Sequence, residues 1–496
     1  MGALNPTDEQ QVVLQRAERG ATLKIKAYAG AGKTSTLKML ADRRTHLRGR
    51  FLAFNKAIAE SAKAKFPKNV QCSTWHSLAY RQVDPYLTQK LNQPKERPQD
   101  LASRYGLGPM RLPSIMGKTV ELSAYQLGAI IADSTGRFCR SAQKEPDTRH
   151  IQVSDMLDDR TADEFKAFIL PHVKRHWEEC LSRDSRAGIS PDVYLKVWEL
   201  SQPIIHADFL LCDEMQDSDG LMLSVLRRQT HAQVLVVGDS HQQIYEWRGA
   251  VNAMDYVRAE EVRLTESFRF GPKFARLATR VLNLLGETIP LRGQAGIQSE
   301  LFEDPDVRPE VDAILCRKNA TVVGELAGGL GKGHRVAVRA NVSEILAFAD
   351  GADQLKRGER AWRPTSLALF ESWKDVQDYA RTFSGRDLLP IVNIIDTQGT
   401  AYLRALLSRI EPDESKASYV ISTVHGAKGL EWNRVRVCGD FRFKQEDDGT
   451  MTLSPEETRL LYVGLTRART VMDVSELKYD LGRVFADHAA RRAKAA

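Results

Sequence analysis

Short apolar runs recur along the chain with no polar face, and helical patterns lie between them. Strands buried on both faces of a parallel sheet read as continuous apolar runs, whereas half-exposed strands alternate. The pattern therefore predicts an α/β fold with parallel strands. The predicted strands are Thr22–Ala27, Phe51–Phe54, Phe209–Cys212, Val234–Val237, Ala313–Cys316, Tyr419–Thr423 and Val435–Cys438.

Two stretches interrupt this alternation. Residues 81–204 are polar and rich in helical pattern, with a basic, Pro-bearing start (QPKERPQD), and residues 336–415 are shorter and mostly helical in pattern. Both are predicted to be helical insertions into the α/β core.

Composition narrows the class of protein. A chain of 496 residues with 42% hydrophobic and 27% charged residues can form packed cores, and its length predicts two to four domains. The formal net charge of +7 is compatible with a polyanionic partner. The six cysteines form no CxxC pair, which argues against a zinc or iron–sulfur site and favours a reduced compartment.

Neither an export signal nor a membrane segment is expected. The N-terminal sequence MGALNPTDEQQ has no basic, apolar leader pattern, and no apolar run approaches the ~18 residues of a membrane span. We expect an intracellular chain, cytoplasmic and nucleoid-associated if its source is bacterial or a phage.

A glycine-rich string, AYAGAGKT, follows the first predicted strand and precedes a helical run. In this context backbone amides at a helix N-terminus can enclose phosphates, a lysine can reach the β and γ phosphates, and a hydroxyl can bind Mg²⁺. The alternative is a glycine-rich structural turn. The residues in question are Ala29, Gly30, Ala31, Gly32, Lys33 and Thr34.

An acidic pair ends the predicted strand in LLCDEMQD. Asp213 is placed to hold Mg²⁺, and Glu214 is placed to act as general base on the attacking water. An acidic loop is the alternative, but the upstream glycine-rich string favours a nucleoside triphosphatase.

Three further strings place polar and aromatic side chains after strand-like runs. FLAFNKAIA and STWHS carry candidate ligand contacts at the edge where such sheets bind ligands, although core packing is an equal alternative for Trp75. VLVVGDSHQQIYEWRGA combines aromatics with an arginine, a combination that grips single-stranded nucleic acid, with a hydrophobic staple on a surface helix as the alternative. The candidate residues are Asn55, Thr74, Trp75, His76, Gln242, Tyr245, Trp247 and Arg248.

Taken in order, these strings resemble those of the superfamily 1 helicases of the UvrD/PcrA/Rep type. DEMQD and GDSHQQIYEWRGA match that family's signatures, and LTESFRF, STVHGAKGLEW and LLYVGLTRAR follow in the family's order. The chain most closely resembles the helicase part of the F-box DNA helicases and their bacterial and phage relatives. No F-box is seen, so no ubiquitin-ligase link is expected.

The resemblance implies roles for individual residues. Gln10 would read adenine, although TDEQ is also a capping box in which Gln10 bonds back to Thr7. Phe268 would stack on adenine, and Gln242 would sense the γ-phosphate. Arg269 and Arg467 would compensate charge on the transferring phosphoryl group. Also implied are nucleotide contacts by Ser35, Gly429 and Glu431, and DNA contacts by Thr423 and His425.

The implied architecture is two RecA-like P-loop lobes with helical insertion subdomains, ATP binding between the lobes and single-stranded DNA running across both. Lobe 1A comprises 1–80 and 205–262, with subdomain 1B at 81–204. Lobe 2A comprises 263–335 and 416–496, with a reduced subdomain 2B at 336–415.

The implied function is an ATP- and Mg²⁺-dependent DNA helicase or translocase that moves 3′ to 5′ on single-stranded DNA and at single-strand/duplex junctions, in DNA repair or recombination control. One alternative is a translocase that displaces proteins such as a recombinase filament and unwinds weakly. Another is an ATP-gated DNA sensor or clamp in a defence or repair complex, for example beside a nuclease subunit. No membrane partner is expected.

Overall fold

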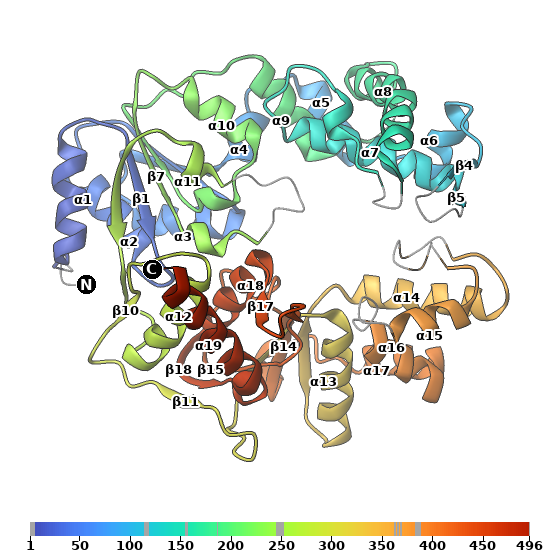
Figure 1. Cartoon of the computed structure of the whole chain (residues 1–496). Coiled ribbons are helices and arrows are strands. Elements are labelled where there is room, and N and C mark those ends of the chain that lie inside the picture. Colours follow the sequence, from blue (N-terminus) through green and yellow to red (C-terminus); the bar gives the residue numbers. More distant parts are fainter. Residues whose placement is uncertain are drawn as a thin grey trace. The chain divides into compact units, whose positions relative to one another are not determined.

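The computed structural model describes residues 5–113, 119–153, 157–185, 187–244, 252–361, 364, 367, 370–381 and 388–495. The chain divides into two compact units. One consists of Met1–Ala27 and Lys33–Leu264, and the other of Tyr28–Gly32 and Thr265–Ala496. Each unit contains a six-stranded sheet flanked by helices (Figure 1).

In the six-stranded sheet of the first unit every pair of neighbouring strands is parallel, in the order β3-β2-β6-β7-β1-β8. Strand β6 (FLLC) is buried at all four positions, as expected of a central strand covered on both faces. The strands are β1 Leu23–Ala27, β2 Gly49–Ala53, β3 Val70–Thr74, β6 Phe209–Cys212, β7 Gln233–Gly238 and β8 Glu260–Leu264. The helices that accompany this sheet are α1 Asp8–Glu18, α2 Lys33–Asp42, α3 Lys56–Lys65, α4 Trp75–Tyr80, α10 Gly220–Arg227 and α11 Ala253–Tyr256.

The segment between α4 and β6 is mostly helical and also contains a short antiparallel hairpin, β4–β5. Its last helix, α9, is anchored to the sheet, because Trp198 is buried in a core shared with Leu210 of β6 and donates from Nε1 to Gln82 Oε1 at 2.8 Å. The elements are α5 Pro85–Gln89, α6 Pro98–Arg104, β4 Met110–Pro113, β5 Thr119–Leu122, α7 Ala124–Cys139, α8 Asp159–Leu181 and α9 Pro191–Leu200.

The second unit also contains a six-stranded sheet in which all neighbouring strands are parallel. Its strand order is β11-β18-β15-β12-β14-β13. Its sheet strands are β11 Glu300–Phe302, β12 Ala313–Cys316, β13 Val336–Arg339, β14 Tyr419–Thr423, β15 Trp432–Val437 and β18 Ala468–Asp473. Two short pairs lie outside this sheet: β9 Glu266–Ser267 with β10 Arg292–Gly293, and β16 Phe443–Gln445 with β17 Met451–Leu453.

Helices of the second unit include a group between β13 and β14 whose core is continuous with the sheet. Leu403 and Val376 of this group are fully buried in the same cluster as Ile421 of β14. The helices are α12 Pro272–Leu284, α13 Asn319–Gly331, α14 Val342–Lys356, α15 Trp373–Ala380, α16 Leu389–Thr397, α17 Gly399–Ser408, α18 Pro455–Leu465 and α19 Lys478–Ala495.

The α/β fold with parallel sheets predicted from the apolar runs is confirmed, and each of the seven predicted strands corresponds to a strand of one of the two sheets. The structure differs at β13, since Val336–Arg339 is a sheet strand although these residues were expected at the start of an insertion. Strands β8 (EEVRL) and β18 (ARTVMD) were not predicted, because charged residues interrupt their apolar pattern. Among the described residues, no helix is long and apolar enough to cross a bilayer.

Candidate active site

The glycine-rich string forms a tight loop from the end of β1 at Ala27 to the start of α2 at Lys33. Gly30 and Gly32 have φ of 73° and 74°, a left-handed conformation that glycine adopts most readily. A Cβ on Gly30 would lie 2.4 Å from Ser267 Oγ, so this position also leaves no room for a side chain. The Ala29 amide donates to the Tyr462 hydroxyl at 3.1 Å.

The first turn of α2 contacts the acidic pair at the carboxyl end of β6. Lys33 Nζ lies 2.7 Å from Glu214 Oε2, and the Thr34 hydroxyl donates to Asp213 Oδ2 at 3.1 Å. Two segments about 180 residues apart in the chain are therefore joined by one ion pair and one hydrogen bond. A hydroxyl and carboxylates are the hard oxygen donors that Mg²⁺ prefers, so these side chains fit a magnesium ion.

Burial and charge act in opposite directions on these groups. Burial alone would lower the pKa of the Lys33 ammonium, but the carboxylates of Glu214, Asp213 and Asp239 outweigh it and raise that pKa. Burial, with the neighbouring Glu214 charge, raises the pKa of the Asp213 carboxyl to about 6. The carboxylates therefore stabilise the charged form of the Lys33 ammonium. A further positive charge at this position would likewise stabilise the ionised form of the carboxylates.

Glu214 has φ 53° and ψ 42°, a left-handed conformation that is uncommon outside glycine and is found disproportionately at functional sites. The carboxylate accepts from Gln216 Nε2 as well as from Lys33. Gln216 Oε1 accepts from the Asp239 amide, and Asp239 Oδ2 accepts from Gln242 Nε2 at 2.7 Å. Gln242 is therefore joined to the acidic pair through two intervening residues, Asp239 and Gln216.

Gln10 takes part in the capping box that was weighed as the alternative to adenine reading. Its Oε1 accepts from the Thr7 amide at 3.0 Å, and its amide donates to Thr7 Oγ1 at 3.3 Å. Its Nε2 donates to Thr36 Oγ1 on α2 at 3.1 Å. An adenine contact by Gln10 stays a prediction, as does a nucleotide contact by Ser35, which is exposed on α2.

In the second unit, the two predicted arginines lie close to each other around Thr466. Arg269 donates to Glu431 Oε2 at 2.5 Å and to Thr466 O at 2.7 Å. Arg467 is 1% exposed and donates to Val463 O, Leu430 O and Thr466 Oγ1. A charge-compensating role for Arg467 would require it to exchange these partners.

Other predicted residues of the second unit have different surroundings. Phe268 is 41% exposed, an unusual exposure for phenylalanine that leaves it accessible to a stacking partner, while its amide donates to Gly30 O at 2.9 Å. Gly429 has φ 81° and lies in an exposed turn. Thr423 Oγ1 accepts from the Gly426 amide, and the neighbouring His425 is half-buried.

The predicted DNA contacts of the first unit do not all reach the surface. Trp75 is 2% exposed within the hydrophobic core, so the structure supports the packing alternative and not base stacking. Thr74 caps α4 by accepting from the Ser77 amide, and Asn55 caps α3 by accepting from the Ile58 amide. His76 Nδ1 lies 3.1 Å from the Tyr194 hydroxyl, and burial lowers the pKa of its imidazole.

Tyr245, Trp247 and Arg248 lie outside the described residues, so their DNA-stacking role stays a prediction.

Sequence reasoning missed two residues that contact the site, Gln216 and Thr36, and gave no role to a third, Tyr462. Gln216 lies in the acidic string DEMQD, and Tyr462 lies in LLYVGLTRAR, so both belong to motifs that the sequence shows. Their contacts with Glu214 and with the Ala29 amide are made in the folded chain and leave no signal in spacing.

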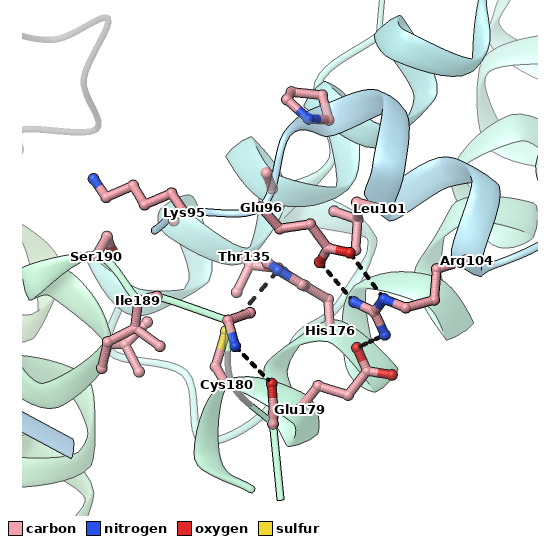
Figure 2. A pocket seen from close by; sticks show the side chains of 17 residues that line it. Lys95, Glu96, Leu101, Arg104, Thr135, His176, Glu179, Cys180, Ile189 and Ser190 are labelled. Carbon is pink, nitrogen blue, oxygen red and sulfur yellow. Dashed lines mark hydrogen bonds and ion pairs between the residues drawn. The ribbon is translucent and has the colours of Figure 1, made fainter. Parts of the chain in front are cut away.

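A separate cavity of about 140 Å³ lies between α6, α7 and α8, away from these residues (Figure 2). Figure 2 shows Arg104 reaching the carboxylates of both Glu96 and Glu179. Burial raises the pKa of the Cys180 thiol to about 11, so it is not a thiolate at neutral pH. No group of three or more His, Cys, Asp or Glu side chains placed to hold a metal ion occurs in the described part of the chain.

A parallel sheet with a glycine-rich loop between β1 and α2, facing an acidic pair at the end of a neighbouring strand, defines the P-loop class of RecA-like folds. The chain belongs to the UvrD-like helicase family: residues 133–479 match the UvrD-like helicase C-terminal domain, and residues 10–248 match the AAA domain.

Individual relatives agree with this membership. The chain is 29% identical to F-box DNA helicase protein 1 of Schizosaccharomyces pombe, covering 93% of this chain and 56% of that protein. It is 29% identical to F-box DNA helicase 1 of Gallus gallus, covering 98% and 50%. It is 26% identical to ATP-dependent DNA helicase UvrD2 of Mycobacterium tuberculosis, covering 53% of this chain and 46% of that protein. The chain thus spans about half the length of the curated relatives it matches.

Proposed function

We propose that this chain is an ATP-dependent DNA motor that hydrolyses ATP at the glycine-rich loop. The observation that carries the proposal is the pair of contacts between Lys33 and Glu214 and between Thr34 and Asp213. They bring a cation, a hydroxyl and two carboxylates to the N-terminus of α2, where phosphate binding is favoured by backbone amides and the helix dipole.

Each residue has a distinct proposed task. Lys33 binds the β and γ phosphates, while the Thr34 hydroxyl and Asp213 hold magnesium. Glu214 orients the attacking water and accepts its proton. Magnesium, when bound, would neutralise charge on the phosphate oxygens. Arg269 and Arg467 of the second unit add positive charge as the γ-phosphoryl group is transferred, so hydrolysis depends on both units.

The proposed track is single-stranded DNA, with movement 3′ to 5′ and unwinding at single-strand/duplex junctions. Membership of the UvrD-like helicase family and similarity to relatives named as DNA helicases support this. The net charge of +7 is compatible with a polyanionic track. We place the activity in DNA repair or recombination control.

The first experiment measures steady-state ATP hydrolysis by the full chain with Mg²⁺, with and without a single-stranded oligonucleotide. We expect strong stimulation by DNA and its loss in Glu214→Gln. Partial duplexes with a 3′ or a 5′ tail then test direction, and we expect unwinding only of the 3′-tailed one. Hydrolysis with no response to DNA would contradict the motor, and unwinding of the 5′-tailed duplex would contradict the direction.

A second experiment addresses the string IYEWRGA. Trp247→Ala is expected to leave DNA-free hydrolysis intact and to weaken stimulation by DNA, because stacking on an aromatic is worth ~1 to 3 kcal/mol per base. Tyr479→Ala, which removes an exposed aromatic of the second unit (73% exposed), serves as the control. Normal stimulation of the Trp247 variant would refute the stacking role.

A further inference from the structure

We propose that Gln216 is a positioning residue that holds the Glu214 carboxylate for catalysis and ties it to Asp239 at the end of β7. The inference rests on the proposed function, since it assigns Glu214 the role of general base. It adds a residue to which neither the sequence strings nor the family match gave a task.

The side chain of Gln216 is completely buried and uses both ends of its amide. Its Nε2 donates to Glu214 Oε2 at 2.5 Å, and its Oε1 accepts from the Asp239 amide at 3.0 Å. Bridging a carboxylate and a backbone N–H requires a donor and an acceptor on one side chain. A glutamate would lack the donor at neutral pH, and a leucine would lack both.

The neighbouring residues restrict where the side-chain amide of Gln216 can lie. A Cβ on Gly238, the last residue of β7, would lie 2.5 Å from Gln216 Oε1, so glycine is needed there for the close approach of the two segments. Glu214 itself has a left-handed backbone, and such a conformation persists only where neighbouring contacts enforce it. Lys33 and Gln216 donate to the same Glu214 oxygen from different elements and restrict that carboxylate.

The bridge continues toward the predicted DNA contacts. Asp239 Oδ1 accepts from the His241 amide, and Oδ2 accepts from Gln242 Nε2 at 2.7 Å. Tyr245 follows Gln242 by three positions in the sequence. Gln216 therefore links the proposed general base to the chain segment that leads into the predicted DNA-contacting string, and its loss is expected to reduce stimulation by DNA as well as basal turnover.

The test compares two variants with a matched control. Gln216→Leu removes the hydrogen bonds that the side chain makes with Glu214, Asp217 and the Asp239 amide. Gln216→Glu keeps the acceptor for the Asp239 amide and removes the donor to Glu214. Gln229→Leu is the control, because Gln229 is a 1% exposed glutamine of the same unit that bonds to Pro203 O, Val225 O and the Ile205 amide, remote from Glu214 in its contacts. Thermal unfolding of all three shows whether each is folded.

We expect both Gln216 variants to lower kcat by about 100-fold, the loss typical of a misplaced catalytic group, with the KM for ATP nearly unchanged. The control is expected to keep the wild-type kcat even if its unfolding temperature falls. A Gln216→Leu protein that does not fold leaves Gln216→Glu, which preserves shape, to decide.

A double-mutant cycle separates positioning from general damage. In a Glu214→Gln background, Gln216→Leu is expected to cost no further turnover, because the group it positions is already gone. Multiplicative losses, or a Gln216→Leu kcat equal to that of Gln229→Leu, would overturn the inference while leaving the proposed function intact. A wild-type chain without ATP hydrolysis would instead overturn the proposed function, and this inference with it.

Discussion

At the scale of single residues, Lys33 is the buried cation that pairs with the acidic residues of the site. Its ammonium is largely buried, lies 2.7 Å from Glu214 Oε2, and has a pKa raised by three carboxylates in spite of burial. Removing it would leave Asp213 and Glu214 close together with no cation between them, a costly arrangement in a buried site.

We predict that Lys33→Ala abolishes ATP hydrolysis. The matched control is Lys38→Ala on the same helix, because Lys38 is partly exposed and forms an ion pair with Asp42 at 2.5 Å. Steady-state hydrolysis at saturating ATP distinguishes the two, and comparable turnover by wild type and Lys33→Ala would remove the glycine-rich loop from the mechanism.

At the scale of elements, helix α9 depends on a buried ion pair. Lys196 is 0% exposed, and its Nζ donates to Glu199 Oε2 at 2.9 Å and to Ser141 O at 3.0 Å. Glu199 also accepts from Ser224 of α10 and from Arg228. The pair thus connects α9 to α10 and to Ser141.

Lys196→Met is predicted to lower the free energy of unfolding by about 3 to 5 kcal/mol, because a buried carboxylate loses its main cation. Lys166→Met, at an exposed Lys166–Asp163 pair, should change it by under ~1 kcal/mol. Urea denaturation of both variants measures the difference, and equal effects would show that the Lys196 pair is not structurally important.

Helix α10 begins with a titrating cap. Asp219 accepts from the Met222 amide at 2.9 Å, and burial raises the pKa of its carboxyl to about 7. Since an unfolded aspartate ionises near pH ~4, the folded state binds the extra proton between these values, so this group reduces stability progressively from about pH 4 to about pH 7.

Asp219→Asn keeps the capping oxygen and cannot ionise. We predict that the variant gains stability relative to wild type on going from pH 5 to pH 8, by on the order of 2 kcal/mol. Urea unfolding at the two pH values tests this. A difference between variant and wild type that does not change with pH would show that Asp219 is ionised throughout.

At the scale of the whole molecule, the proposed reaction draws on both units. Lys33, Asp213 and Glu214 belong to the first unit, and Arg269 belongs to the second. Arg269→Ala is predicted to lower kcat about 1,000-fold, the low end for loss of an arginine that stabilises the transferring phosphoryl group. Arg276→Ala on α12, an exposed arginine of the same unit, is the control. Unchanged kcat in Arg269→Ala would mean that hydrolysis needs the first unit alone.

Much of the fold and part of the site could be predicted because their signals are local. Continuous apolar runs identify strands covered on both faces, as at Phe209–Cys212, whereas β8 and β18 escaped because charged side chains interrupt them. The spacing of AYAGAGKT encodes a loop whose glycines adopt left-handed φ, since that requirement is met within a few residues.

The sequence by itself determined the α/β class, the glycine-rich loop, the acidic pair and the family, because each produces a recognisable pattern in a short contiguous stretch of residues. Only the tertiary structure decided that Trp75 packs in the core, that Arg467 donates to backbone carbonyls, and that Gln216 bridges Glu214 and Asp239. Burial and hydrogen-bond partners depend on segments brought together by folding, and neither is a property of a local pattern.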